Sequence, residues 1–400
     1  MQVLVINCGS SSVKSRTYTL PDKRLIAQGV VDRIAEESSQ LTWRCDGRTH
    51  RRDVKVEDHD RATRLLLRML LNEGPAVAAE AATIEAVGHR VVHGGDEVRD
   101  VVRIDEACIS LIERFEPLAP LHNPVGLAGV RAAMEVLPDV PHVACFDTTF
   151  HRTMPEMACT YALPLEFQAK YGIRRYGFHG ISHRYAVERA ARMLGREPQR
   201  LNAITCHLGN GCSVSAIRQG RSVDTSMGMT PLEGLVMGTR GGDMDPGVLL
   251  YLAQRGVPPE TLDDICRRRS GLLGLSGVSS DMRDVLQSAR QGNRNADLAV
   301  DIFCYRLKKY IGAYLAAIGR LDALVFTGGI GENAPEIRAR TCMGLDALRI
   351  EIDKRKNRAA VGVEADVAPD ANVMRVLVIP ANEELAIADE VYRWMQQGRR

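Results

Sequence analysis

Residues 3–19 have the sequence VLVINCGSSSVKSRTYT, which joins two strand-like segments through a loop of small residues. Residues 203–218, AITCHLGNGCSVSAIR, repeat the same order of strand, tight loop and second strand. A parallel sheet would place a helix after each loop, whereas a short loop between two strands predicts an antiparallel hairpin. The repeat therefore predicts two related domains, each offering a hairpin loop to a shared cleft.

The other apolar, β-branched runs also end at loops rich in glycine or polar residues. Four of them lie at residues 86–92, 143–146, 322–327 and 376–380. Between these runs the spacing of apolar residues is helical, and from Val300 to Ile318 it predicts one face of a long helix. Alternating strands and helices predict an α/β fold. We place the domain boundary near residue 150.

Composition excludes several classes of protein. The 400 residues carry a formal net charge of +2, which gives no reason to expect a nucleic-acid or membrane surface. Ten cysteines are scattered singly without a CxxC pair, so a zinc cage is not expected, and this usage fits a reducing compartment. A leader-like N-terminus and an apolar run of 18 residues are both absent from the sequence. We therefore predict a cytoplasmic protein.

Three loops have the composition of phosphate-binding sites. The segment from Asn7 to Lys14 combines small residues, hydroxyls and one cation, and the segments 207–211 and 328–333 are rich in glycine. Small residues let backbone N–H groups approach an anion closely. Each loop alone is also compatible with a solvated turn, and the three together favour phosphate binding. The Walker pattern does not occur, so a P-loop enzyme is disfavoured.

Two arginines and several carboxylates or histidines are candidates for catalysis. Arg90 ends an apolar strand and Arg240 lies in a glycine-rich loop, where their planar guanidinium groups suit carboxylate and phosphate. The alternative for Arg240 is an ion pair with Asp243 or Asp245. Asp147 and Glu383 follow buried strands, as magnesium ligands or ligand-positioning groups often do. His122, His179 and His183 are further polar candidates, although a lone histidine is more often structural.

Ten ordered motifs resemble those of the acetate kinases, a family of the sugar kinase, Hsp70 and actin superfold. They are NCGSSSVK, GHRVVHGG, PLAPLHNP, FDTTFH, YGFHGISH, HLGNGCS, TRGGDMDPG, SSDMRD, TGGIGEN and ANEE. The resemblance covers essentially the whole chain. It implies two related ribonuclease-H-like domains with an interdomain active-site cleft. Residues 1–149 would form the first, with the segment from about 386 to 400 packing back on it, and residues 150–385 the second.

The resemblance also implies a role for each matching residue. Catalysis is assigned to Asp147, Arg90, Arg240 and His179. The acetate site is assigned to Arg90, Val92, Leu121, His122, Phe178 and Pro231, and magnesium to Asn7 and Glu383. The nucleotide and its phosphates are assigned to Lys14, Ser10, Ser12, His207, Leu208, Gly209, Asn210, Gly211, Asp281, Met282, Arg283, Gly331, Glu332, Asn333, Ala334 and Pro335. The family often has Ser or Cys where this chain has Gly241, and a glycine there is expected to loosen the arginine loop.

The implied activity is reversible, Mg²⁺-dependent, in-line phosphoryl transfer from ATP to acetate, which gives acetyl phosphate and ADP, with Mn²⁺ as a substitute metal. Phosphoryl transfer of this kind needs mainly positioning and charge stabilisation. One alternative is a kinase for propionate or another short carboxylate. Another, from a different class, is an ATP-driven chaperone or filament protein of the same superfold. The resemblance implies a homodimer with small-molecule partners only.

Overall fold

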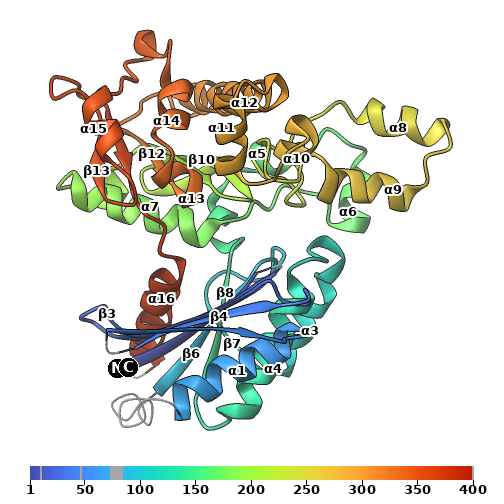
Figure 1. The fold of residues 1–400 in the computed structure, drawn as a ribbon, viewed down its shortest axis with the longest axis vertical. Helices are drawn as coiled ribbons and strands as arrows, with labels where there is room; N and C mark the ends of the chain where they lie inside the picture. The colour runs from blue at the N-terminus through green and yellow to red at the C-terminus, as the bar shows by residue number, and fades with distance from the viewer. Residues whose placement is uncertain (10, 46, 73–83, 399–400) are drawn as a thin grey trace. The chain divides into compact units, whose positions relative to one another are not determined.

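The structure is a computed structural model, and it describes residues 1–9, 11–45, 47–72 and 84–398. The chain divides into two compact units. Unit 1 comprises Met1–Thr149 and Asn382–Arg400, and unit 2 comprises Phe150–Ala381. Each unit contains one β-sheet with helices packed on both of its faces (Figure 1).

The sheet of unit 1 has the strand order β5-β4-β3-β2-β1-β6-β8-β7. Its strands are β1 (Gln2–Cys8), β2 (Ser12–Thr19), β3 (Arg24–Asp32), β4 (Ser39–Cys45), β5 (Arg48–Val54), β6 (Ile84–Val91), β7 (Val102–Arg103) and β8 (His142–Phe146). Strand β1 is antiparallel to β2, with Asn7 opposite Lys14, and parallel to β6, which is parallel to β8. The carboxyl ends of β1, β6 and β8 therefore lie along one edge of the sheet, the usual position of ligand-binding groups in such sheets.

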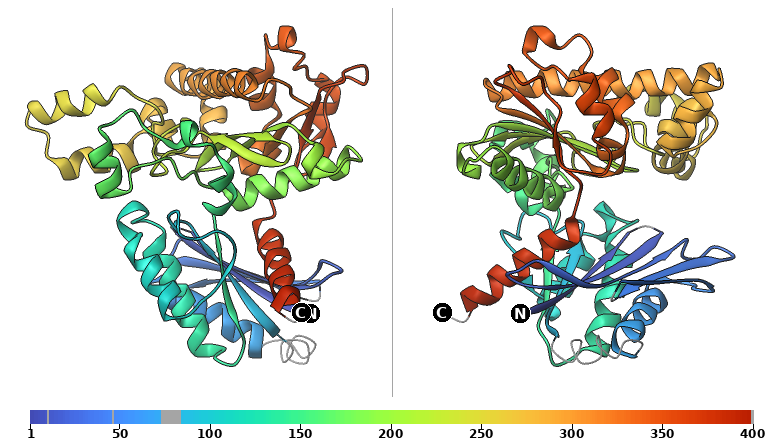
Figure 2. Two further views of the ribbon diagram at one scale, coloured as in Figure 1. Left: turned by 180° about the vertical axis from the view of Figure 1, so that it is seen from behind. Right: turned by 60° about the vertical axis from the view of Figure 1, so that its left-hand side comes forward.

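The helices of unit 1 are α1 (His59–Asn72), α3 (Glu106–Arg114), η1 (Glu116–Leu118), α4 (Asn123–Val136) and α16 (Glu383–Gly398). Side chains alternate between the two faces of a strand. Leu4 and Ile6 of β1 pack with Leu66 of α1 in one apolar cluster. On the opposite face, α16 lies against the sheet at β6 (Figure 2). A Cβ atom on Gly88 of β6 would come within 2.7 Å of Ile387 of α16. A larger residue at position 88 would push α16 away from the sheet.

The sheet of unit 2 has the order β11-β10-β9-β12-β14-β13. Its strands are β9 (Ala203–Leu208), β10 (Cys212–Arg218), β11 (Arg221–Thr225), β12 (Ala323–Thr327), β13 (Ala365–Asp366) and β14 (Arg375–Val378). Strand β9 is antiparallel to β10 and parallel to β12, which is parallel to β14. The order β11-β10-β9-β12-β14 thus repeats the order β3-β2-β1-β6-β8 of unit 1. The predicted fold class, two related ribonuclease-H-like α/β units, is confirmed.

The helices of unit 2 cover both faces of its sheet. They are η2 (Thr149–Thr153), α5 (Glu156–Cys159), α6 (Leu165–Tyr171), α7 (Gly180–Met193), η3 (Pro198–Arg200), α8 (Pro246–Gln254), α9 (Pro259–Asp264), η4 (Ile265–Arg269), α10 (Gly271–Ser276), α11 (Met282–Arg290), α12 (Arg294–Ile318), α13 (Gly328–Asn333), α14 (Pro335–Cys342), η5 (Asp346–Leu348) and α15 (Lys354–Ala359). Helix α7 packs on one face through Val187, Ala190 and Ala191. Helix α12 lies on the other face and contains the predicted helical stretch from Val300 to Ile318.

The segment 328–333 differs from the loop that its glycines suggested, because it forms the short helix α13 directly after β12. Gly328 has φ +78°, and a Cβ atom there would lie 2.8 Å from the carbonyl oxygen of Leu208. Glycine is needed for this close approach of α13 to the β9–β10 hairpin. The helix therefore begins beside the second hairpin loop.

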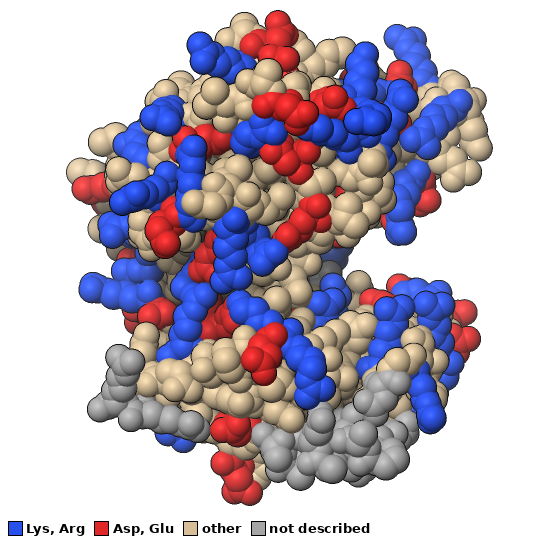
Figure 3. All heavy atoms as spheres, turned by 90° about the vertical axis from the view of Figure 1, so that its left-hand side faces the viewer, with Lys and Arg blue, Asp and Glu red and all other residues tan. Residues whose placement is uncertain are grey.

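Basic and acidic side chains are interspersed over the face drawn in Figure 3, in keeping with the net charge of +2. Among the described residues, every helix is too short or too polar to cross a membrane.

Candidate active site

In unit 1 the site is built around Arg90, at the end of β6, and Asp147, just after β8. Arg90 donates from Nε to Oδ1 of Asp147 over 3.2 Å and from Nη2 to Oδ2 over 2.6 Å. Asp147 is 1% exposed. Burial alone would lower the pKa of Arg90, but the carboxylates of Asp147 and Glu383 raise it above its usual value. Arg90 is therefore a fixed, permanently charged fork, since both oxygens of Asp147 hold its plane.

Asn7, at the end of β1, links Arg90 to two carboxylates at the start of α16. Its Oδ1 accepts from Nη1 of Arg90 over 3.4 Å, and its Nδ2 donates to Glu384 over 3.0 Å and to Glu383 over 3.4 Å. Arg90 Nη1 also lies 3.7 Å from Oε2 of Glu383. The sequence indicated Asn7 and Glu383 but not Glu384, whose buried carboxylate is also paired with Arg16. These groups form one oxygen-rich cluster.

The first hairpin loop places its lysine beside this cluster. Lys14 is opposite Asn7 in the β1–β2 register, so the two side chains lie on the same face of the sheet, and Lys14 is exposed. The hairpin is closed by Gly9 N–H, which donates to the carbonyl of Ser12 over 2.8 Å. Ser12 begins β2. Ser10, which the sequence also assigned to the phosphates, lies outside the described residues.

The residues assigned to the apolar pocket of unit 1 come together through Asn123, which sequence reasoning missed. Its Oδ1 accepts from His93 N–H over 3.1 Å and its Nδ2 donates to His93 O over 3.0 Å. These bonds hold the segment after β6, which contains the buried Val92, against the start of α4, where Leu121 and His122 lie. The structure thus joins the two segments of unit 1 that carry these three residues.

In unit 2 Arg240 is half-buried and donates from Nη1 to the carbonyl of Pro231 over 2.8 Å. Asp243 and Asp245 were the alternative partners, but Asp243 pairs with Arg306 and Asp245 caps α8. Among the described residues Arg240 has no carboxylate partner, and burial lowers its pKa below its usual value. A buried cation without a counter-ion is costly, and a bound anion would relieve that cost.

His179 lies beside Arg240 and directly precedes helix α7. It occupies the left-handed region at φ +58° and contacts Ser213, its Nδ1 lying 2.9 Å from Oγ. Its ring stacks on His207 with centroids 4.3 Å apart. A Cβ atom on Gly211 would lie 2.9 Å from Nη2 of Arg240 and 3.3 Å from Nε2 of His179, so both groups face this glycine. Phe178 precedes His179 and is buried.

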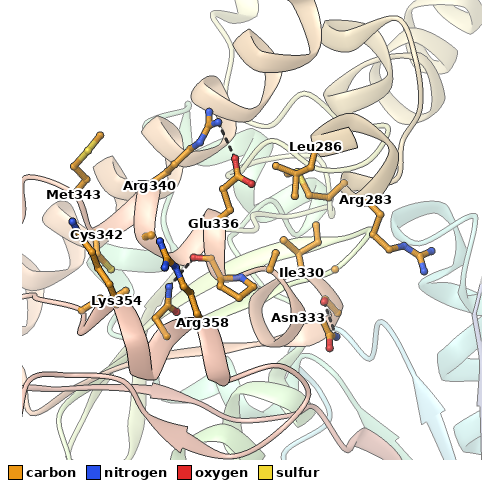
Figure 4. A pocket seen from close by; sticks show the side chains of 18 of the residues that line it. Arg283, Leu286, Ile330, Asn333, Glu336, Arg340, Cys342, Met343, Lys354 and Arg358 are labelled. Atoms are coloured by element: carbon orange, nitrogen blue, oxygen red, sulfur yellow. Dashed lines mark hydrogen bonds and ion pairs between the residues drawn. The ribbon is translucent and has the colours of Figure 1, made fainter. Parts of the chain in front are cut away.

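A cavity of about 1650 Å³ opens in unit 2 between α11, α13, α14 and α15 (Figure 4). Eight residues that the sequence assigned to the nucleotide line it: Gly209, Asn210, Asp281, Met282, Arg283, Asn333, Ala334 and Pro335. The other assigned residues of unit 2 lie outside its lining: His207, Leu208, Gly211, Gly331 and Glu332. Leu208 is fully buried, and Glu332 accepts from Ala381 N–H over 2.8 Å, so these two support the cavity wall.

The cavity also has lining residues that the sequence did not indicate, among them Ile330, Glu336, Arg340, Lys354 and Arg358 (Figure 4). Glu336 accepts from Arg340 over 2.9 Å at the wall. The predicted segment 281–283 is held by Asp281, which caps α11 and pairs with Arg283. Arg283 lowers the pKa of the Asp281 carboxyl.

Behind this cavity lies Arg338, a fully buried arginine on α14 that sequence reasoning also missed. It donates to Gly331 O over 2.8 Å, to Ala360 O over 2.6 Å and to Asn357 through both its side-chain and main-chain oxygens. Burial lowers its pKa to about 10. Asn357 in turn donates to Pro335 O over 2.8 Å. This cluster joins α13, α14 and α15, so it fixes three walls of the cavity.

Comparison with known proteins gives one consistent result. Residues 2–389 match the acetokinase family. The acetate kinase of Thermotoga maritima is 48% identical over 391 residues, which is 97% of both chains. The crystal structure of Porphyromonas gingivalis acetate kinase superposes with a TM-score of 0.90 and 42% identity, covering 98% of this chain and 99% of that one. A propionate kinase from Francisella tularensis gives 0.90 and 39%, covering 97% and 98%.

Proposed function

Because this chain belongs to the acetokinase family, we propose that it transfers the γ-phosphoryl group of ATP reversibly to acetate, giving acetyl phosphate and ADP. The observation that carries the proposal is the contrast between the two arginines. Arg90 is neutralised and oriented by Asp147, whereas Arg240 is half-buried without a carboxylate partner among the described residues. Arg240 therefore suits an anionic substrate group.

The acceptor needs no general base. A simple carboxylic acid has a pKa of about 4, so acetate is already ionised at neutral pH. Both carboxylate oxygens of Asp147 are bonded to Arg90. We therefore assign Asp147 the role of orienting the Arg90 guanidinium, in preference to proton transfer.

The difficulty of the reaction is to bring one anion onto another, and cationic groups solve it. Arg90 and Arg240 would hold the carboxylate and the moving phosphoryl group, and Lys14 would approach the phosphates of ATP. His179 would donate a hydrogen bond to the phosphoryl oxygens as charge spreads over them. Removing one such donor typically costs on the order of 10²–10³ in rate. In in-line transfer the phosphoryl group passes from ATP directly to acetate. The cationic groups of both units would therefore act on the same transfer step.

The donor set of unit 1 fits a magnesium ion. Mg²⁺ prefers oxygen ligands and commonly takes one or two carboxylates, with water and phosphate completing its shell. Asn7, Glu383 and Glu384 offer such oxygens within one hydrogen-bonded cluster. Among the described residues there is no group of three or more histidines, cysteines or acids that could hold a metal ion. When bound, Mg²⁺ would neutralise phosphate charge.

The adenine nucleotide is proposed to occupy the cavity of unit 2. Its phosphates would lie near Gly209 and Asn210, at the end of the hairpin loop, where the backbone is accessible. The base would lie between α11 and α13, against Ile330 (Figure 4) and Met282, which both line the cavity.

Acyl phosphate formation tests the function directly. Incubation with ATP, Mg²⁺ and acetate in the presence of hydroxylamine would trap acetyl phosphate as the hydroxamate. Arg240→Ala should lower the rate by on the order of 10²–10³ with the fold intact. Arg192→Ala, which removes an exposed arginine on α7, is the matched control. Wild-type rates in a folded Arg240→Ala enzyme would remove Arg240 from the mechanism, and an inactive wild type would refute the function.

Propionate is the second candidate acceptor, because the propionate kinase superposes as well as the acetate kinase does. Val92, buried after β6, narrows the methyl pocket that the family resemblance assigns to it. One methylene is worth only about 1–3 kcal/mol of discrimination, so propionate should be a poorer but measurable substrate. Equal kcat/KM for acetate and propionate would overturn the preference. A homodimer and a cytoplasmic location stay predictions that rest on the resemblance.

A further inference from the structure

Four side chains of unit 2 form an unbroken line of hydrogen bonds that ends at His179. Thr205 Oγ1 lies 2.7 Å from Nδ1 of His183, and Nε2 of His183 lies 2.7 Å from Oγ of Ser213. Ser213 Oγ lies 2.9 Å from Nδ1 of His179. Thr205, His183 and Ser213 are all fully buried. The line therefore runs from Thr205 on β9 to His183 on α7. It continues through Ser213 on β10 to His179, which precedes α7.

The direction of these bonds is set at the buried end. The Thr205 hydroxyl has one partner among the described residues, which is Nδ1 of His183. A buried hydroxyl proton without an acceptor is costly, so Thr205 donates and Nδ1 of His183 accepts. The opposite direction would point the His183 proton at Thr205 and leave the threonine proton without an acceptor.

The remaining protons follow from that first one. Burial, with smaller effects of His151 and His207, lowers the pKa of His183 well below its usual value, so the ring is neutral and carries one proton. Since Nδ1 accepts, that proton is on Nε2 and is donated to Ser213 Oγ. The Ser213 hydroxyl then directs its own proton to Nδ1 of His179.

We propose that Thr205, His183 and Ser213 are positioning residues that hold His179 in the tautomer with its hydrogen on Nε2. That nitrogen faces Gly211 beside Nη2 of Arg240, so the pair presents two donors to one place. The opposite tautomer would present a lone pair there, which repels an anion. The catalytic use of this donor rests on the proposed function, whereas the tautomer itself is a property of the protein without substrate.

The tautomer is measured by two-bond ¹H–¹⁵N correlation spectra of protein labelled with ¹⁵N-histidine, because the two ring nitrogens of each tautomer give different patterns. The His179 signals are assigned by their absence in His179→Gln. The expected result for the wild type is an Nε2–H pattern. Ser213→Ala should populate both tautomers of His179, because the variant lacks the hydroxyl that donates to Nδ1.

Removing the Ser213 hydroxyl should lower kcat and leave KM nearly unchanged. Ser213→Ala should lower kcat on the order of 10-fold, less than the 10²–10³ expected for losing the donor itself, with the KM for ATP and acetate little changed. Ser213→Thr keeps the hydroxyl and should restore most of kcat. The matched control is Ser215→Ala on the same strand, which removes an equally buried hydroxyl whose partner is Thr225 at 2.8 Å.

Two results would overturn the proposal: an Nδ1–H pattern for His179 in the wild type, or equal losses of kcat in Ser213→Ala and Ser215→Ala. If Ser213→Ala does not fold, Thr205→Val and Thr205→Ser replace it. Only Thr205→Val removes the hydroxyl proton that sets the direction of the hydrogen bonds, so only this variant should populate both tautomers of His179. Identical spectra for Thr205→Val and Thr205→Ser would also overturn the proposal. The spectra remain decisive even if acyl phosphate formation, and with it the proposed function, fails.

Discussion

Acid should destabilise unit 2 through His151, a buried histidine that has no part in the proposed chemistry. The side chain is 1% exposed, and both ring nitrogens are bonded, Nε2 to the carbonyl of Phe178 at 3.0 Å and Nδ1 to the hydroxyl of Ser222 at 2.9 Å. Burial lowers the pKa of His151 to about 4, although the bond to the Phe178 carbonyl raises it in part. The folded state therefore holds this ring neutral.

The sign and size of the pH effect on the free energy of unfolding follow from proton linkage. A histidine with a pKa of about 4 when folded and about 6.5 when unfolded binds more protons in the unfolded chain, so stability is full above pH 6.5 and falls as pH drops toward 4. Between pH 7 and pH 5 this one group should lower the free energy of unfolding by about 2 kcal/mol. The pKa values of His89 and His183 are also lowered by burial, so they add losses of the same sign.

The assay is urea unfolding followed by far-UV circular dichroism at several pH values from 5 to 8. His151→Gln loses packing and hydrogen bonds at every pH, but it should be less sensitive to acid. The stability gap between wild type and variant should therefore narrow by about 2 kcal/mol from pH 7 to pH 5. His50→Gln, a substitution at an exposed histidine on β5, is the control. Parallel pH profiles for wild type and His151→Gln would refute the reasoning.

Three further outcomes are expected. Gly242→Ala should lower the free energy of unfolding by at least about 2 kcal/mol, because the residue has φ +71° and its Cβ would lie 2.3 Å from Gly234 O. Gly241→Ser should change it by about 0.5 kcal/mol or less in the same thermal-unfolding experiment. Arg338→Lys should raise the KM for ATP while the KM for acetate stays near wild type, since the lost bonds fix the nucleotide cavity; equal rises in both would contradict this. Val92→Ala should raise the ratio of kcat/KM for propionate over acetate by about tenfold, and an unchanged ratio would place the methyl pocket elsewhere.

The loosening of the arginine loop by Gly241 stays a prediction, and the geometry shows that a side chain would fit at this position. A Cβ atom at this position would meet only Ser270 at 3.7 Å, which is an ordinary contact. The conformation depends on Gly242 instead, whose left-handed backbone passes close to Gly234. The family resemblance implies that another residue type is common at position 241. It does not show that the backbone there tolerates either residue.

The strand-end residues were predictable because their position follows from the fold class. Asn7, Arg90 and Asp147 each end or follow a strand of one parallel set, so an α/β sheet brings them to one edge. The residues that were missed have no such signal. Asn123 and Arg338 act through main-chain carbonyls and amides of segments distant in the sequence, and a buried polar side chain on a helix resembles a surface one until its partners are known.

The two hairpins have the same strand register but carry different side chains at one equivalent pair of positions. Asn7 pairs with Lys14 in unit 1, and His207 pairs with Ser213 at the equivalent register of unit 2. In unit 1 the second strand offers an exposed cation at this position. In unit 2 both side chains are buried, and they bond to Ser182 and His179 of the α7 segment. In unit 1 Asn7 bonds to Glu383 and Glu384 at the start of α16, and Lys14 stays exposed, so this register position is proposed to face ligands in unit 1 and to orient His179 in unit 2.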